Sequence, residues 1–328
     1  MSPVPSLPNL RRMVAKSLSS GKEVSSDGSS QAFAPPTALA GVLPITRYWG
    51  QMKHNDANGY PVPPIPRYFK NFDWVIGFDW GWLDFDIKPR HIFVRPNHLP
   101  RLTRILGILG RRNFVDCELF IAGDDHRLSQ LLDQVQILLP HFKTVFFEAI
   151  DIDFPGVEIF SMGFIEHYLR GLDSRVMTLM NSPAEKNSLV LAAWGKHWPQ
   201  LDRKIEDRTA ARVYVEASKK AQFKVLEGSQ YWRELSVSKF ALCPEGKGLQ
   251  SPKIFEAILM GTVPVATPNP TSLKLVEKGV PMLIVDRWDQ FDYINHNQVF
   301  ASFSESLQGF RGLLKAHEKY WAFQRSVE

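Results

Sequence analysis

A glycine-containing loop between an apolar strand and a helix is the clearest candidate for chemistry in this sequence. Residues 240–243 form the apolar run, and the loop that follows carries Gly246 and Gly248. Free backbone N–H groups and the helix dipole favour a phosphate where such a loop meets the first turn of a helix. Lys247 and Lys253 add positive charge at the same place. The spacing therefore predicts a phosphate-binding turn.

The residues after this loop predict a short helix and then a second strand. Ser251 is a suitable N-cap and Pro252 a suitable first helical residue. Gly261 ends the helix, and residues 262–266 start the next strand. The apolar residues at helical spacing are Ile254, Ala257, Ile258 and Met260. The alternative is an ordinary strand–helix–strand unit with a tight turn and no ligand.

Residues 239–266 resemble the donor-binding half of a GT-B glycosyltransferase, most of all that of the exostosin-like family. That family carries a strand, a Pro and Gly loop, a Ser, a basic residue, Glu-Ala, and a Gly before a small-Pro-Val strand. The resemblance implies an α/β fold of two Rossmann-like domains that face each other across a cleft. It also implies a nucleotide-sugar donor, held by Pro244, Glu245, Gly246, Lys247, Gly248, Ser251, Lys253 and Glu256.

Other protein classes share parts of this pattern. The segment also resembles fucosyltransferases that use a GDP-sugar, but those carry Thr-Glu-Lys where this chain has Ser-Pro-Lys at 251–253. A UDP-sugar is therefore the favoured donor. A non-catalytic nucleotide-sugar or glycan-binding protein on the same fold remains an alternative, as does an epimerase or another nucleotide-diphosphate enzyme.

Further donor-binding candidates lie in the second half of the chain. Gly195 would let the backbone approach a ligand, and Lys196 would meet a phosphate. Arg208 and Arg212 lie one helical turn apart, so that either could form a forked contact with a diphosphate, although a solvated basic helix face is an alternative. Glu256 is expected to accept hydrogen bonds from ribose hydroxyls, and the alternative is an ordinary surface Glu.

A general base is needed to take the proton from the acceptor hydroxyl. Asp125 and His126 follow a predicted strand, and an Asp-His pair in the first half is also a feature of the exostosin-like family. We therefore expect one of them to be the base, with a helix cap as the structural alternative. His98 and Glu148, each at a strand end, are the next candidates.

The transfer is expected to be inverting. No metal or other cofactor is expected, because lysines, arginines and N–H groups can stabilise the diphosphate leaving group. A GT-A transferase is the rival hypothesis, since Asp151 and Asp153 match its metal-binding Asp-x-Asp pattern. Metal dependence of the activity would distinguish the two. Residues 79–84 place two tryptophans beside carboxylates and are a candidate lining of the acceptor channel, or part of the core.

Composition is that of an ordinary globular protein. The 328 residues are 44% hydrophobic and 22% charged, with a net charge of +5. That charge suits anionic nucleotides, and no clustered basic stripe or motif suggests nucleic acid. The expected partners are a nucleotide-sugar donor and a glycan or glycoconjugate acceptor. Cys117 and Cys243 lie in apolar runs, which predicts buried free thiols and favours a reducing compartment.

The order of the predicted elements gives the domain organisation. Residues 1–40 are predicted to be a disordered leader, and their basic residues keep a targeting peptide as an alternative. Residues 41–180 are predicted to form the acceptor domain. Residues 181–302 predict the nucleotide-sugar-binding domain, and 303–328 a terminal helix. Strands and helices alternate in both domains, which predicts parallel sheets. No run of about 20 apolar residues predicts a transmembrane segment, and we expect a cytoplasmic protein.

Overall fold

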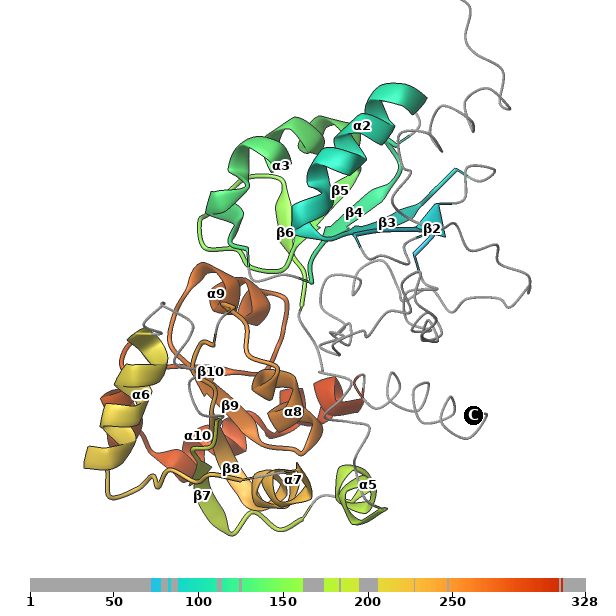
Figure 1. The fold of residues 1–328 in the computed structure, drawn as a ribbon. Helices are drawn as coiled ribbons and strands as arrows, with labels where there is room; N and C mark the ends of the chain where they lie inside the picture. Colours follow the sequence, from blue (N-terminus) through green and yellow to red (C-terminus); the bar gives the residue numbers. More distant parts are fainter. Residues whose placement is uncertain are drawn as a thin grey trace, which may run out of the picture. The chain divides into compact units, whose positions relative to one another are not determined.

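The computed structural model of the chain contains two compact α/β units, which divide between Phe160 and Ser161 (Figure 1). The sequence places the boundary near residue 180, so the helix before that residue belongs with the second unit. The predicted leader lies outside the described residues. The structure describes residues 72–77, 82–83, 88–110, 114–123, 126–161, 174–182, 184–194, 206–226, 228–246, 248–312 and 314.

The first unit is built on a sheet of five parallel strands with one short antiparallel strand at its edge. The strand order is β2-β1-β3-β4-β5-β6, and β2 pairs antiparallel with β1. The parallel sheet confirms the α/β prediction, whereas β2 lies within the 79–84 segment that we expected to be a loop. The strands are β1 (Trp74–Ile76), β2 (Trp82–Leu83), β3 (His91–Val94), β4 (Glu118–Ile121), β5 (Thr144–Phe147) and β6 (Val157–Ile159).

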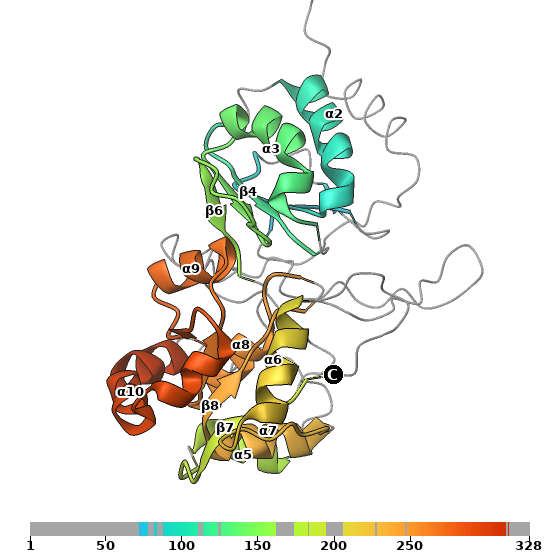
Figure 2. The ribbon, with the colours of Figure 1, turned by 90° about the vertical axis from the view of Figure 1, so that its left-hand side faces the viewer.

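Two helices cover one face of this sheet, α2 (Leu99–Leu109) and α3 (Leu132–Leu138), with short 3-10 turns beside them (Figure 2). The parallel strands follow one another in chain order, and right-handed connections that all step the same way place their helices on the same side. Gly110, with φ 84°, follows the last turn of α2. The 3-10 turns are η3 (Pro96–His98), η5 (Leu128–Gln130) and η6 (Leu139–His141).

One face of the first sheet carries a row of phenylalanines, and the other face carries Trp74. Phe93, Phe120 and Phe146 pair across β3, β4 and β5, and the rings of Phe120 and Phe146 stack at 4.6 Å. On the other face, Trp74 packs edge-on against Phe114, which follows α2. The phenylalanine row therefore points away from α2 and α3, and it is nonetheless buried.

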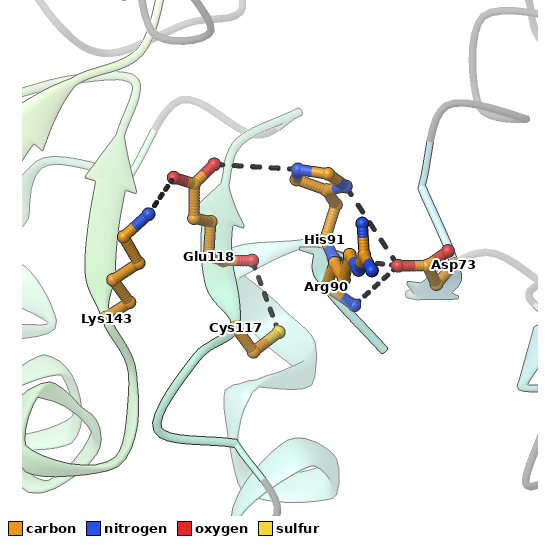
Figure 3. A network of polar contacts seen from close by, with 6 residues as sticks. All are labelled: Asp73, Arg90, His91, Cys117, Glu118 and Lys143. Carbon is orange, nitrogen blue, oxygen red and sulfur yellow. Dashed lines mark hydrogen bonds and ion pairs between the residues drawn. The ribbon is translucent and has the colours of Figure 1, made fainter. Parts of the chain in front are cut away.

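A polar cluster joins the amino ends of these strands (Figure 3). Asp73 accepts hydrogen bonds from the backbone N–H groups of Arg90 and His91 at 2.6 and 2.9 Å. Glu118, only 4% exposed, has its carboxylate oxygens 3.7 Å from His91 Nε2 and from Lys143 Nζ. The cluster aligns β1, β3, β4 and β5 at the edge opposite the one where ligands bind in open parallel sheets.

The second unit contains a sheet of four parallel strands in the order β10-β9-β8-β7. The second parallel sheet was also predicted. Each strand lies beside its predecessor, as the parallel strands of the first sheet also do, so the described parallel strands of neither sheet contain the reversal of order at which doubly wound folds open a crevice. The strands are β7 (Ser188–Leu191), β8 (Ser238–Leu242), β9 (Val263–Ala266) and β10 (Leu283–Ile284).

The helices of the second unit agree only in part with the sequence-based expectations. The sequence pattern predicts a helix over residues 207–223, but the observed helix ends at Ala217. The pattern does not predict α5, α7, η7 and α10. Residues 304–312 are helical, as expected for the start of the terminal helix. Within the described residues, no helix has both the length and the hydropathy needed to cross a bilayer. The elements are α5 (Ser174–Asn181), α6 (Glu206–Ala217), α7 (Gly228–Val237), α8 (Lys253–Leu259), α9 (Pro270–Glu277), η7 (Trp288–Tyr293) and α10 (His296–Ser302).

A half-buried lysine and a buried arginine hold the helix ends at the amino edge of the second sheet. Lys186 Nζ donates to the carbonyl oxygens of Ser236 in α7 (2.6 Å) and of Met260 after α8 (2.8 Å), and to the Thr262 hydroxyl (3.0 Å). Arg311 donates to carbonyl oxygens at the ends of α5 and α8. Cations are favourable at helix C-termini, where carbonyl groups have no partner within the helix.

This arrangement predicts a pH dependence of stability. Burial and the nearby Arg311 lower the pKa of Lys186 to about 7, whereas an unfolded lysine has a pKa of about 10.4. Between these values the unfolded chain holds one more proton, so the free energy of unfolding rises with pH. The contribution is complete above about pH 10.4 and is lost as the pH falls towards 7.

We expect the Lys186→Met variant to lose this rise and about 1–3 kcal/mol of stability, because it leaves buried acceptors without a donor. Urea unfolding of the parent and the variant at about pH 7 and about pH 8.5 measures both effects. Other titrating groups affect both proteins alike. Equal pH dependence in the two proteins would contradict the prediction.

Candidate functional site

At the carboxyl edge of the second sheet, the Asp207 carboxylate joins three segments. Its Oδ2 accepts a hydrogen bond from the backbone N–H of Glu245, after β8, at 2.8 Å. Its Oδ1 accepts from the Thr267 hydroxyl, after β9, at 2.9 Å and from Trp288 Nε1, in η7, at 2.8 Å. The start of α6 is thereby fixed to the loops that end the central strands.

The side chain of Glu245 extends this connection to α9. Its Oε1 accepts a hydrogen bond from Asn269 Nδ2 at 2.8 Å, and Asn269 Oδ1 caps α9 by accepting from the backbone N–H of Ser272 at 2.7 Å. Glu245 was predicted to hold the donor directly. In the structure its amide donates to Asp207 and its carboxylate accepts from Asn269, and both contacts shape the loop.

Arg208, the residue after Asp207, lies against the glycine loop. A Cβ atom built on Gly246 would lie 2.9 Å from Arg208 Nη2, which is closer than Cβ atoms approach other atoms. The φ of Gly246 is not in the left-handed region, so glycine is needed there for the space that it leaves and not for its backbone angles. The contact brings together two of the predicted donor-binding residues.

The Arg208 side chain is half-buried and forms no ion pair with the described residues. Its Nε is buried without a hydrogen bond, and within the described residues the side chain forms no ion pair. Burial lowers the pKa of Arg208, and the nearby Asp207 opposes that shift. An arginine remains charged at neutral pH even so. A half-buried charge that forms no ion pair with the described residues is a candidate place for an anion from solution.

Arg212, one turn further along α6, is engaged elsewhere. Its Nε donates to Glu216 Oε1 at 2.6 Å, and its guanidinium carbon lies 3.8 Å from the centre of the Phe223 ring. The sequence leaves open which of the two arginines faces a diphosphate. The contacts favour Arg208.

Lys253 and Glu256, predicted to bind the donor from α8, lie around Tyr231 of α7. Glu256 is 3% exposed, and its Oε2 accepts a hydrogen bond from the Tyr231 hydroxyl at 2.8 Å. Burial raises the pKa of Glu256. Lys253 Nζ lies 4.1 Å from the centre of the Tyr231 ring. Lys253 is half-buried, whereas Glu256 is buried, and Tyr231 had no signal in the local sequence.

The start of α8 differs from the expected phosphate-binding helix. Pro252, not Ser251, flanks the helix, and no side chain caps its first turn. The helix has seven residues, so its dipole is that of two turns. Ser251 is nevertheless buried, and in the described part of the chain its hydroxyl has no hydrogen-bond partner. The Ser251 hydroxyl is therefore not used to cap α8 and can donate to a ligand.

The remaining donor-site predictions have different outcomes. Pro244 is buried and continues the loop after Cys243, a free buried thiol whose pKa is raised to about 12 by burial. Gly248 lies in the partly exposed part of the loop. The predictions for Gly195, Lys196 and Lys247 lie outside the described residues. Cys117 is the second free buried thiol, as predicted.

In the first unit, the loops after β4 and β5 meet at the carboxyl edge of the sheet. Glu148 Oε2 accepts a hydrogen bond from the backbone N–H of Gly123 at 2.7 Å, so it orients that loop. His126 follows the loop, and its Nδ1 is buried without a hydrogen-bond partner. Asp125 lies outside the described residues. The Arg95 side chain, which the sequence did not suggest, lies within contact distance of Gly77 and Gly123, both of positive φ.

Asp151, the first residue of the Asp-x-Asp pattern, makes contacts within the protein. Asp151 Oδ1 accepts a hydrogen bond from the backbone N–H of Ser129 at 2.9 Å, and Oδ2 accepts from the Ser129 hydroxyl. Asp151 therefore holds the turn η5 in place. Among the described residues, no three His, Cys, Asp or Glu side chains gather in a group that could hold a metal ion.

The sequence matches no protein-family model. The resemblance to the exostosin-like family therefore stays a prediction, and the functional argument depends on the site itself.

The close approach of Arg208 to Gly246 gives a direct test. In the Gly246→Ala variant the new methyl group displaces the guanidinium, and we expect weaker binding of inorganic pyrophosphate. Because the displaced atoms are the end of a flexible side chain, the free energy of unfolding should change by less than about 0.5 kcal/mol. Isothermal titration calorimetry and urea unfolding measure the two quantities.

Gly309→Ala is the matched control, because a Cβ at that position meets nothing within 4 Å. It should bind pyrophosphate as the parent does. Unchanged affinity in Gly246→Ala would show that the guanidinium position is unimportant for anion binding.

Proposed function

We propose that this protein is a glycosyltransferase that moves a sugar from a nucleotide-diphosphate sugar, a UDP-sugar by preference, to a hydroxyl of a glycan or glycoconjugate. The proposed fold is GT-B, with two Rossmann-like domains facing each other. The observation that carries the proposal is the Arg208 guanidinium, which lies beside Gly246 at the carboxyl edge of a parallel sheet without an anionic partner among the described residues. The two parallel sheets are consistent with this fold.

The chemistry of the leaving group connects Arg208 to this function. When the sugar departs, negative charge develops on the diphosphate, and fixed positive groups in a water-poor site stabilise it. A guanidinium donates two parallel hydrogen bonds to phosphate oxygens, which a point charge cannot do. Because Arg208 already lies in a partly desolvated position, it needs little reorganisation when that charge appears.

The loop after β8 completes the proposed donor site. Gly246 leaves room for a phosphate near the backbone. The Ser251 hydroxyl has no partner in the described residues and can donate to a phosphate or ribose oxygen. Lys253 contributes charge through its position over Tyr231, and Glu256 supports Tyr231 from the protein interior. In the proposal, Glu256 is therefore a supporting residue, not the main ribose contact.

For the acceptor side, we propose His126 or Asp125 as the general base of an inverting, metal-independent transfer. His126 has a ring nitrogen without a hydrogen bond, which a general base needs in order to accept a proton. Glu148 is a weaker candidate because one of its oxygens already accepts from Gly123.

The donor proposal is tested by removing one arginine at a time from α6. We expect Arg208→Ala to weaken UDP binding by about 1.5–3 kcal/mol, the range for charge-assisted hydrogen bonds. Arg212→Ala removes the same charge one turn away and should leave UDP binding unchanged. Calorimetry with UDP, GDP and uridine gives the affinities, and slow hydrolysis of the matching nucleotide sugars shows whether the bound donor is turned over.

Two results would contradict the proposal. If the parent binds uridine as well as UDP, the diphosphate is not recognised. If both arginine variants lose affinity equally, the effect is one of net charge and not of a built site. Binding without any hydrolysis or transfer would favour a non-catalytic sugar-nucleotide binder.

A further inference from the structure

We propose that Asp207 is a positioning residue, which holds Arg208 and the Glu245–Gly246 peptide together so that both bind the same diphosphate. This inference rests on the proposed function. Asp207 itself does not touch the ligand, because its two oxygens are taken by donors of the protein.

The contacts follow a paired pattern along two segments. Asp207 binds the amide of Glu245, and the next residue of the helix, Arg208, lies against the next residue of the loop, Gly246. Two consecutive residues of α6 thus contact two consecutive residues of the loop after β8. A shift of either segment would separate the guanidinium from the loop backbone.

The hydrogen bonds of Asp207 come from neutral groups. Its donors are one backbone N–H, one hydroxyl and one indole N–H, and within the described residues no ion pair joins it to Arg208. The Asp207 charge is stabilised locally and does not cancel the positive charge of its neighbour. Arg208 therefore keeps its capacity for forked hydrogen bonds to an anion. Through space, Asp207 also counteracts the lowering of the Arg208 pKa by burial.

The Asp207→Asn substitution removes the hydrogen bond to the loop and keeps the other two. The amide oxygen can still accept from the Thr267 hydroxyl and the Trp288 indole on one side. The amide nitrogen then faces the N–H of Glu245, so that two donors meet and the bond to the loop is lost. The side chain keeps its size, while the loop loses its link to α6.

Asp292→Asn, in η7, provides a matched control at the other end of α6. Asp292 of η7 accepts hydrogen bonds from the Tyr214 hydroxyl at 2.8 Å and from Ser218 Oγ at 3.2 Å, at the far end of α6. Between residues 207 and 214 an α-helix rises about 10 Å. The control removes the same charge and disturbs the same packing of α6 on η7, but it lies away from the glycine loop.

The experiment is a calorimetric titration with inorganic pyrophosphate at a temperature where each variant is folded by circular dichroism. We expect Asp207→Asn to weaken pyrophosphate binding about tenfold or more, the size of a lost charge-assisted contact. Asp292→Asn should bind as the parent does. In an Arg208→Ala background, Asp207→Asn should have little further effect. If Asp207 acts through Arg208, the losses of the two substitutions are not additive.

Three outcomes would overturn the proposal: parent-like binding by Asp207→Asn, an equal loss in Asp292→Asn, or additive losses in the double variant. If Asp207→Asn does not fold, Thr267→Val removes one of the bonds that fix the carboxylate, and parent-like binding by that variant would also count against the proposal. Absence of pyrophosphate binding in the parent would instead reject the proposed diphosphate site, so the two failures are distinguishable.

Discussion

Hydrogen bonds to the Asp207 carboxylate join the start of α6 to the loops after β8 and β9 and to η7. These segments are far apart in the sequence, and they meet because parallel strands end at the same edge of the sheet. Once they are joined, Arg208 lies beside Gly246 with its charge uncompensated by the described residues. The proposed anion site at this edge depends on that single carboxylate.

The opposite edge of the same sheet has a different role. There, Lys186 and Arg311 bind carbonyl groups at the ends of α5, α7 and α8, so their charges are used within the protein. The donors of Lys186 and Arg311 at the amino edge are engaged by the fold, whereas Arg208 at the carboxyl edge forms no ion pair with the described residues. Because the described parallel strands of both sheets show no reversal of order, the proposed site depends on these side chains and not on a crevice between diverging strands.

The sequence predicted the features that depend on local pattern. The parallel strands, the glycine loop and the free thiols follow from short apolar runs and turn residues, and they are confirmed. The sequence could not distinguish Arg208 from Arg212, since that choice depends on which helix face meets the loop. Asp207, Trp288 and Tyr231 act through long-range contacts without a local signal. Glu256 was expected near the surface, but α8 is enclosed and the residue is buried.

Hydrogen–deuterium exchange with and without UDP tests the central claim most directly, because it locates the bound diphosphate without a substitution. The account predicts slower exchange in peptides that contain the start of α6 and residues 239–246, with uridine giving little protection. Peptides from β4 and β5 of the first sheet should exchange as before. Equal protection by uridine, or protection confined to the first sheet, would contradict a diphosphate site formed by Arg208 and the glycine loop.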